Sequence, residues 1–378
     1  MAISRMRERT SRSRFFGAMT WASIAFLPLS AAQTETSVSA CADKAGRLIR
    51  LHPRGSSLAA TIAPDRGGEL VGLEFIRSGK HRPLLYRDLD FCERPGWEGK
   101  APVLWPATGR NFAVDPSTLP KGAPTSDAFG WVWHGQRYPM PIHGFARSLP
   151  WSVTRQSESS VRVLLADNDR TRIAYPFGFR FEIQYSVSGD VLTVTHRVTA
   201  ATDNGEPMPF SIGNHVTFDI GNVASAKDAR LTSPATRQIL TDAEGRPTGT
   251  VVDRPPLDHV RLATLGRQSA LSLGGYAADT VSAKLEMADG VTILIRQPRV
   301  AYPDRDLIRF NIWGDVDEGF FAIEPWFGRQ NSLASGEGVI WLAPGKTFEW
   351  RFIVSASDVA SSAHHDDRSK ASPRQTGW

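Results

Sequence analysis

Cysteine is scarce in this 378-residue chain, which has only Cys41 and Cys92. Two cysteines are too few for a disulfide framework or a cysteine-rich metal site. A zinc site would need a His-Glu-x-x-His helix or closely spaced Cys/His pairs, and neither occurs. We therefore expect no metal. In an oxidising compartment the two cysteines could pair with each other.

Signatures of nucleotide, acyl-transfer and glycosidase chemistry are also missing. No phosphate-cradling glycine-rich loop follows a strand pattern, and Ser211 lacks the glycines of a nucleophile elbow. A glycosidase would need two convergent carboxylates. The numerical candidates stand in turn-like contexts that are typical of solvated loop acids, namely Asp304, Asp306, Asp315 and Asp317.

The N-terminus has the pattern of a secretory signal. Five arginines precede an uncharged segment at 15–29, and Ser30-Ala31-Ala32 supplies the small residues that a signal peptidase needs. A membrane anchor, the alternative, would need about 20 apolar residues. A lipoprotein box at Val38-Ser39-Ala40-Cys41 is a weaker alternative, because polar residues separate it from the apolar segment. We expect residues 1–32 to be removed and the mature chain to be exported, periplasmic or secreted, without a membrane anchor.

The net charge of +5 belongs mostly to this leader. Residues 1–32 hold five Arg and one Glu, so they carry +4 and about +1 is left for the remainder. No basic run with interleaved aromatics occurs in that remainder. The composition therefore predicts no nucleic-acid partner.

What dominates the mature chain is an alternation of apolar and polar residues with a period of two. The runs 179–187 and 192–198 flank the turn signal Ser188-Gly189-Asp190, which predicts a β-hairpin with one buried face. Similar runs occur at 161–165, 291–296 and 348–354, without a competing amphipathic helix. The sequence predicts an all-β protein, a large antiparallel sandwich or barrel, as one domain at 33–356. We expect the polar tail at 357–378 to be disordered.

One carboxylate stands in an unusual setting. Glu324 lies in the apolar run 321–328 and is followed by Pro325. Because proline cannot donate to a central β-ladder, we expect the strand to end there with the acid at its rim. Glu324 is then either a general base or an edge carboxylate that points to water.

Two histidines also stand in unusual settings. His215 follows Gly213 and Asn214, which interrupt an apolar strand, and His143 lies between a proline-rich segment and Gly144. A glycine inside a strand often marks a bulge or the close approach of a ligand, which would aim the imidazole into a cleft. The structural alternatives are a core histidine bonded to a carbonyl and a turn histidine. What remains is a histidine and carboxylate combination without metal or nucleotide.

Together these segments resemble the aldose 1-epimerase (mutarotase) family, nearest to the branch with a His-Gly-Phe-Ala-Arg motif shared with hexose-6-phosphate epimerases. Residues 138–151, 210–218 and 321–328 are similar to the two histidine motifs and the Glu-Pro-Trp motif, in the family's order. Residues 102–110 are similar to a strand that ends in Gly-Arg. The resemblance covers most of residues 60–355. It implies a galactose mutarotase-like supersandwich that interconverts α and β anomers of a free aldose, without a cofactor.

The resemblance also implies roles for individual residues. Glu324 would take the proton of the C1 hydroxyl and His215 would protonate the ring oxygen, while His143 and Arg110 would hold sugar oxygens. Asp279 is our choice for a further sugar-binding aspartate. Ring opening needs one acid and one base, and we expect a carboxylate ionised near pH 7 and a histidine that titrates nearby.

The chain departs from the family at a few positions. Val216 and Thr217 stand where many relatives have proline and an aromatic residue, and Asn331 stands where an acid is frequent. The loop 111–130 is longer than usual and could cover the site. Hexose 6-phosphates are disfavoured, because the chain is expected to be exported and no extra basic cluster stands out.

Two further classes of protein stay open. The chain could be a non-catalytic carbohydrate-binding protein of the same fold, or an envelope protein whose sandwich mediates protein contacts. The triad of His143, His215 and Glu324 favours the enzyme, because binding alone needs no matched acid and base. The expected partner is a small-molecule sugar, an aldohexose, acted on by a monomer or homodimer.

Overall fold

The computed structural model describes residues 46–92, 99–265, 270–277, 279–300, 302 and 307–358. The predicted signal at 1–32 and Cys41 lie outside these residues, whereas Cys92 is disulfide-bonded. The last strand, β25 (Thr347–Asp358), runs slightly past the predicted domain end at 356, and the rest of the predicted tail lies outside the described residues.

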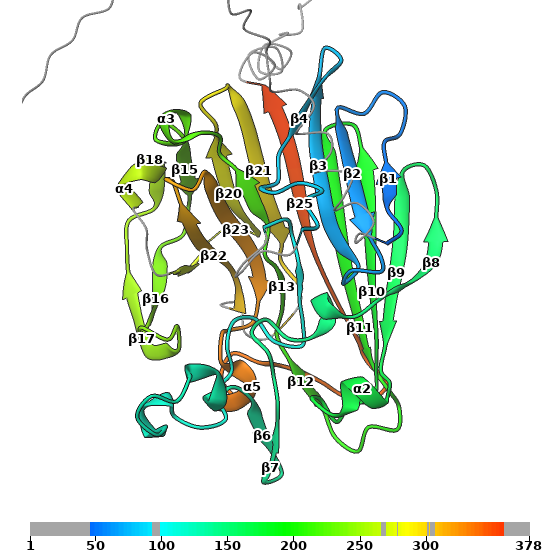
Figure 1. Cartoon of the computed structure of the whole chain (residues 1–378), viewed down its shortest axis with the longest axis vertical. Coiled ribbons are helices and arrows are strands. Elements are labelled where there is room, and N and C mark those ends of the chain that lie inside the picture. Colours follow the sequence, from blue (N-terminus) through cyan, green and yellow to red (C-terminus); the bar gives the residue numbers. More distant parts are fainter. Residues whose placement is uncertain are drawn as a thin grey trace, which may run out of the picture. The chain divides into compact units, whose positions relative to one another are not determined.

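Two large antiparallel sheets form the body of the unit that begins at Cys41 (Figure 1). The first has nine strands, in the spatial order β18 (Leu257–Arg261), β15 (Arg230–Ser233), β20 (Thr280–Glu286), β21 (Val291–Pro298), β25, β11 (Val191–Ala200), β10 (Phe179–Ser188), β9 (Ser160–Ala166) and β8 (Ser152–Gln156). The second has eight strands, in the order β17 (Pro247–Asp253), β16 (Arg237–Thr241), β19 (Leu271–Gly274), β22 (Ile308–Asp315), β23 (Phe320–Phe327), β13 (Ile212–Asn214) and β5 (Val103–Leu104), with β14 (Thr217–Asp219) also paired to β23.

Smaller elements complete the fold. A four-stranded sheet is formed by β1 (Ile49–Leu51), β2 (Leu58–Ala63), β3 (Glu69–Arg77) and β4 (Lys80–Pro83), and its β2 contacts β10 and β11 of the nine-stranded sheet. Two strand pairs are β12 (Met208–Phe210) with β24 (Ile340–Leu342) and β6 (Trp131–Trp133) with β7 (Gln136–Tyr138). The described helical turns are short: η1 (Pro116–Thr118), η2 (Thr125–Ala128), η3 (Ala146–Ser148), α2 (Asp169–Arg172), α3 (Val223–Ala226), α4 (Leu262–Leu265) and α5 (Ser332–Ser335).

The β10–β11 hairpin shows how the alternating pattern determines the fold. Ser188 pairs with Val191 across a two-residue turn in which Gly189 has a φ of 61°. Every second side chain of the two strands is buried, as the period of two requires. The predicted hairpin and the strands predicted at 161–165, 291–296 and 348–354 are therefore confirmed.

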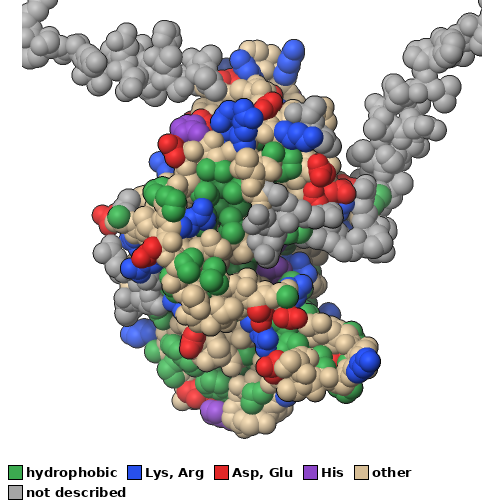
Figure 2. Space-filling view, turned by 90° about the vertical axis from the view of Figure 1, so that its left-hand side faces the viewer, with side chains coloured by type: hydrophobic (Ala, Val, Ile, Leu, Met, Phe, Trp, Pro, Cys, Tyr) green, Lys and Arg blue, Asp and Glu red, His purple; other side chains and the backbone are tan. Residues whose placement is uncertain are grey.

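The core lies between the sheets. Trp105, which follows β5, packs at a tilt against Phe179 and Phe181 of β10, with ring centroids 4.4 and 5.3 Å away. Each large apolar side chain that is fully buried stabilises the fold by about 1.5–3 kcal/mol. Acidic and basic side chains are interspersed over the face in Figure 2, which agrees with a mature chain of nearly balanced charge.

Strand β23 does not end at Pro325, contrary to the sequence prediction. The strand continues to Phe327, and Glu324 is 1% exposed in the interior of the sheet instead of at a rim. The N–H of Ile323 donates to the carbonyl of Val216. The backbone nitrogen of Pro325, two residues further along the strand, therefore faces the same neighbouring strands. Pairing on that side is interrupted between β13 and β14. The missing N–H of proline therefore faces a break in the ladder, where no donor is needed.

Candidate active site

A cavity of about 890 Å³ lies against β22 and β23. The alternation of these strands sends Phe310, Ile312 and Ile323 into the core, so the intervening side chains face the other way. Four of those side chains line the cavity, namely Asn311, Trp313, Glu324 and Trp326. This volume is typical of small-molecule sites.

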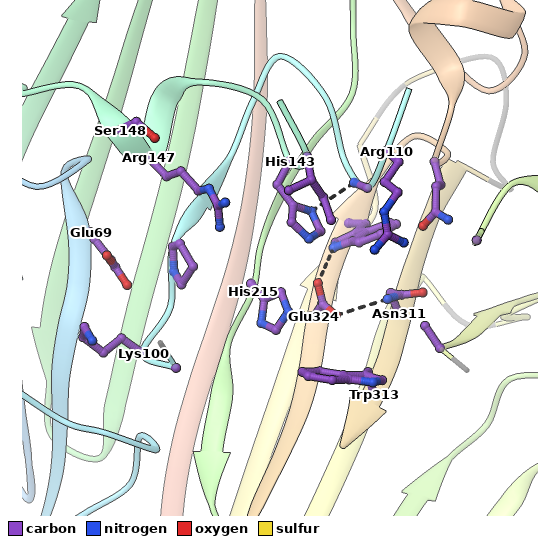
Figure 3. A pocket seen from close by; sticks show the side chains of 18 of the residues that line it. Glu69, Lys100, Arg110, His143, Arg147, Ser148, His215, Asn311, Trp313 and Glu324 are labelled. Carbon is purple, nitrogen blue, oxygen red and sulfur yellow. Dashed lines mark hydrogen bonds and ion pairs between the residues drawn. The ribbon is translucent and has the colours of Figure 1, made fainter. Parts of the chain in front are cut away.

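Glu324 lies on the floor of this cavity (Figure 3). Its Oε1 accepts a hydrogen bond of 3.1 Å from Asn311 Nδ2, and its Oε2 accepts one of 3.1 Å from Trp326 Nε1. Burial raises the pKa of Glu324 to about 8, although both hydrogen bonds favour the charged form. The prediction that this carboxylate is ionised near pH 7 is therefore wrong for this structure. At pH 7 most of the carboxyl carries a proton.

His215 lies in the break between β13 and β14, with 6% of its surface exposed. Its backbone N–H donates to the carbonyl of Pro102 at 3.0 Å. Its Nε2 is 3.7 Å from Glu324 Oε1, and its Nδ1 is 3.0 Å from Thr217 Oγ1. Burial, with a smaller contribution from the charge of Arg147, lowers the pKa of His215 to about 3. His215 is therefore neutral at pH 7, and it does not titrate near neutrality as the sequence predicted.

His143 lies beside this pair, with its ring centroid 5.6 Å from that of His215. Its φ of 65° is left-handed, and the N–H of Gly109 donates to its Nδ1 at 3.0 Å. Because Nδ1 accepts this bond, the proton of the neutral ring is on Nε2. Burial holds the pKa of His143 well below its usual value, and the ring of His215 contributes to this.

Arg110 lines the cavity on the same side as His143 (Figure 3). Its Nη1 donates to the carbonyl of Glu244 at 3.1 Å, and its guanidinium lies 6.0 Å from the ring centre of Phe129. These contacts direct a cationic donor group along one wall. The structure thus brings together four of the five predicted site residues.

Asp279 is the exception and needs a correction. It is exposed and immediately precedes β20, a strand of the nine-stranded sheet, whereas the cavity is built on the eight-stranded sheet. It is not among the residues that line the cavity. The geometry therefore gives Asp279 no part in this site.

The loop 111–130 does not line the cavity either. The wall on that side is formed instead by Thr241, Asp242, Ala243 and Gly245. Arg246 connects the two segments, because it pairs with Asp242 at 2.6 Å and with Asp115 at 3.0 Å. The long loop thus lies behind the wall segment and supports it.

A charged arm of the cavity was missed in the sequence. We use this name for Arg66, Glu69, Lys100 and Arg147, which all line the cavity. Figure 3 shows Glu69, Lys100 and Arg147 beyond His215. Burial raises the pKa of Glu69 to about 7, and the charges of Lys100, Arg147 and Arg66 act in the opposite direction. The expectation that no basic cluster accompanies the site is therefore wrong. Its members are far apart in sequence, although Arg147 ends the His-Gly-Phe-Ala-Arg motif.

Asn311 and Trp313 were also missed. Asn311 is paired with Glu324 in the register of β22 and β23. A buried asparagine within an apolar strand was the signal that could have revealed it.

Within the described residues, no group of three or more His, Cys, Asp or Glu could hold a metal ion, and no helix is long and apolar enough to cross a membrane.

Comparison with solved structures defines the class of fold. A galactose mutarotase-like protein from Lactobacillus casei superposes with a TM-score of 0.65 at 22% sequence identity, over 82% of this chain and 100% of that protein. The predicted fold class is confirmed: the chain is an antiparallel supersandwich of the galactose mutarotase-like type.

Comparison of sequences gives the family. The model of the aldose 1-epimerase family matches residues 127–286, which confirms the predicted resemblance to that family. Protein LacX of Lactococcus lactis is 24% identical over 255 residues, which are 64% of this chain and 77% of LacX. A putative glucose-6-phosphate 1-epimerase of Salmonella typhimurium is 26% identical over 159 residues, or 38% of this chain and 49% of that protein.

Proposed function

We propose that this chain is an exported, cofactor-independent aldose 1-epimerase that interconverts the α and β anomers of a sugar. The observation that carries the proposal is the buried pair of Glu324 and His215, with Oε1 and Nε2 3.7 Å apart on the floor of the cavity. Export is proposed from the leader pattern at 1–32.

The number of protons that Glu324 and His215 hold together suits the reaction. Ring opening takes a proton from the C1 hydroxyl and gives one to the ring oxygen, and closure after rotation of the aldehyde reverses both transfers. With the pKa of Glu324 raised to about 8 and that of His215 lowered to about 3, the pair holds one proton at pH 7. One partner can therefore accept while the other donates.

We assign Glu324 to the C1 hydroxyl and His215 to the ring oxygen. In the resting pair the shared proton lies on Glu324, and it passes to His215 Nε2 as ring opening begins. Glu324 then takes the proton of the C1 hydroxyl while His215 gives its proton to the ring oxygen, so the pair ends in its resting state, and closure reverses these transfers. Positioned proton transfer of this kind contributes about 10²- to 10⁴-fold in rate. His143, with its proton on Nε2, and Arg110 supply donors that can hold sugar hydroxyl oxygens.

A non-catalytic sugar-binding protein of the same fold is the main alternative. Such a protein needs hydroxyl partners and apolar contacts, and Arg110, Asn311 and Trp313 could supply these. It does not need a buried carboxyl whose ionisation is opposed by its surroundings. Strongly shifted pKa values in a cleft favour catalysis over binding alone.

A second candidate substrate class comes from the charged arm. Three cationic side chains line one end of the cavity together with Asp65 and Glu69, and Glu69 carries a proton for about half of the time near pH 7. This excess of positive charge favours a sugar with an anionic substituent, such as a hexose phosphate. The relative from Salmonella typhimurium is described as a putative glucose-6-phosphate 1-epimerase, which is in line with this candidate.

Polarimetry of freshly dissolved α-glucose, α-galactose and glucose 6-phosphate tests both substrate classes with the mature chain. We expect acceleration over the spontaneous rate by the wild type and loss of it in Glu324→Gln. Glutamine retains the shape of the carboxyl, so sugar binding measured by calorimetry should survive. Asp279→Asn is the matched control, because it also removes one carboxylate but lies outside the cavity.

The outcomes separate the alternatives. Acceleration confined to glucose 6-phosphate would favour the anionic sugar, and acceleration of the neutral sugars would favour a free aldose. If a sugar binds but none of the three sugars exchanges anomers faster, the chain is a sugar-binding protein and not an epimerase.

A further inference from the structure

Thr217 is the first residue of β14 and is fully buried behind His215. It does not line the cavity, so it cannot touch a bound sugar there. Its Oγ1 lies 3.2 Å from the carbonyl oxygen of His215 and 3.0 Å from Nδ1 of the same residue. One hydroxyl therefore contacts both the backbone and the ring of the proposed catalytic histidine.

The single proton of this hydroxyl determines the direction of both bonds. A carbonyl oxygen can only accept, so Thr217 donates its proton to the carbonyl of His215. The hydroxyl oxygen is then left to accept, and the ring must donate from Nδ1. The neutral imidazole consequently carries its proton on Nδ1 and has an unprotonated Nε2, the atom that lies 3.7 Å from Glu324 Oε1.

His143 is held in the opposite way. A backbone N–H, which can only donate, approaches its Nδ1 from Gly109 at 3.0 Å, so its proton lies on Nε2. The two rings stand at 88° to each other with centroids 5.6 Å apart. One ring is thus built to accept a proton and its neighbour to donate a hydrogen bond.

We infer that Thr217 is a positioning residue that holds His215 as the Nδ1–H tautomer, so that Nε2 takes and returns the proton shared with Glu324. The catalytic consequence of this inference rests on the proposed function, whereas the tautomer itself does not. The Thr217 hydroxyl also accepts from Nδ1 after Nε2 is protonated, so it stabilises the imidazolium that the reaction requires.

Other charged and titratable groups that face His215 act elsewhere. Glu324 on β23 faces Nε2, and His143 and Arg147 act on the ring through their charges or their positions across the cavity. The backbone carbonyl of His215, which also favours the protonated ring, accepts the Thr217 hydroxyl. Removal of the Thr217 hydroxyl should therefore change the tautomer and leave Glu324 in place.

The test compares Thr217→Val, which preserves the branched shape, with Thr217→Ser, which preserves the hydroxyl. Nitrogen-15 NMR of histidine-labelled protein reports which ring nitrogen carries the proton, and His215→Gln identifies the His215 signals. We expect the Nδ1–H pattern in the wild type and in Thr217→Ser, and its loss in Thr217→Val. We expect kcat to fall roughly tenfold to a hundredfold in Thr217→Val with KM little changed, and to recover mostly in Thr217→Ser.

An Nε2–H signal in the wild type, or an unchanged tautomer and kcat in a folded Thr217→Val, would overturn the inference. A role in packing alone would lower the stability of Thr217→Val without a change of tautomer. If the wild type shows the expected tautomer but accelerates no sugar, the proposed function fails and the tautomer assignment stands.

Discussion

The raised pKa of Glu324 predicts that removal of its charge stabilises the protein at alkaline pH. Burial raises this pKa from 4.5 to about 8. Each pKa unit corresponds to about 1.36 kcal/mol, so ionised Glu324 lowers the free energy of unfolding by at most roughly 5 kcal/mol. Below pH 4.5 the carboxyl is protonated in both the folded and the unfolded state, and the stabilisation from the protonated carboxyl is fully present. As pH rises from 4.5 towards 8 the unfolded state loses its proton first, so the free energy of unfolding falls.

Glu324→Gln should remove this dependence and retain the contacts. The glutamine oxygen can accept from Trp326 Nε1, and its amide can donate to Asn311 once that side chain turns its oxygen inward. Between pH 5.5 and pH 8.5 the stability of the variant should therefore improve relative to the wild type by about 3 kcal/mol.

Urea unfolding at several pH values measures this difference, with all other titrating groups common to both proteins. Glu158→Gln, an exposed residue, controls for the loss of one carboxyl. A difference between Glu324→Gln and the wild type that stays constant across this pH range would refute a raised pKa. It would also remove the reason why the pair holds one proton at pH 7.

Three further predictions concern the site and its supports. Asn311→Leu removes the donor to Glu324 Oε1, so the carboxylate should become harder to form and anomer exchange at pH 7 should fall roughly tenfold or more in a rate assay. Gly144→Ala should destabilise the fold by about 3 kcal/mol or more in urea unfolding, because its φ is 74° and an added Cβ would lie 2.2 Å from the carbonyl oxygen of Trp105. Gly135→Ala, at a similar φ of 75° in open space, should lose only about 1 kcal/mol, and equal losses would contradict the steric reason. Asp279→Asn should leave the exchange rate unchanged, and a large loss would return that residue to the site.

The sequence predicts the strands better than it predicts their ends. The period of two at 179–198 identified a hairpin whose faces the structure confirms. The end expected at Pro325 was wrong, because a proline is tolerated where the neighbouring strand is interrupted, and that interruption at His215 is a long-range feature. Local propensity carries no information about the pairing partner.

The site residues also separate into those that local sequence predicts and those that depend on long-range packing. Motifs predicted His143, His215, Glu324 and Arg110, because each is marked by its immediate neighbours in sequence. The charged arm and Asn311 depend on register and on packing between distant segments, so no local pattern marks them. The protonation states were predicted wrongly for the same reason, because burial is a property of the folded chain.

Magnetisation exchange between the α and β anomeric NMR signals of a sugar is the most direct test of the proposed reaction. Added wild-type protein at pH 7 should speed exchange well above the spontaneous rate, and the same concentration of Glu324→Gln should leave it at that rate. Equal acceleration by both proteins would contradict the assignment of proton transfer to Glu324. Exchange at the spontaneous rate with the wild type, for both neutral and phosphorylated hexoses, would contradict the account of this cavity as an epimerase site.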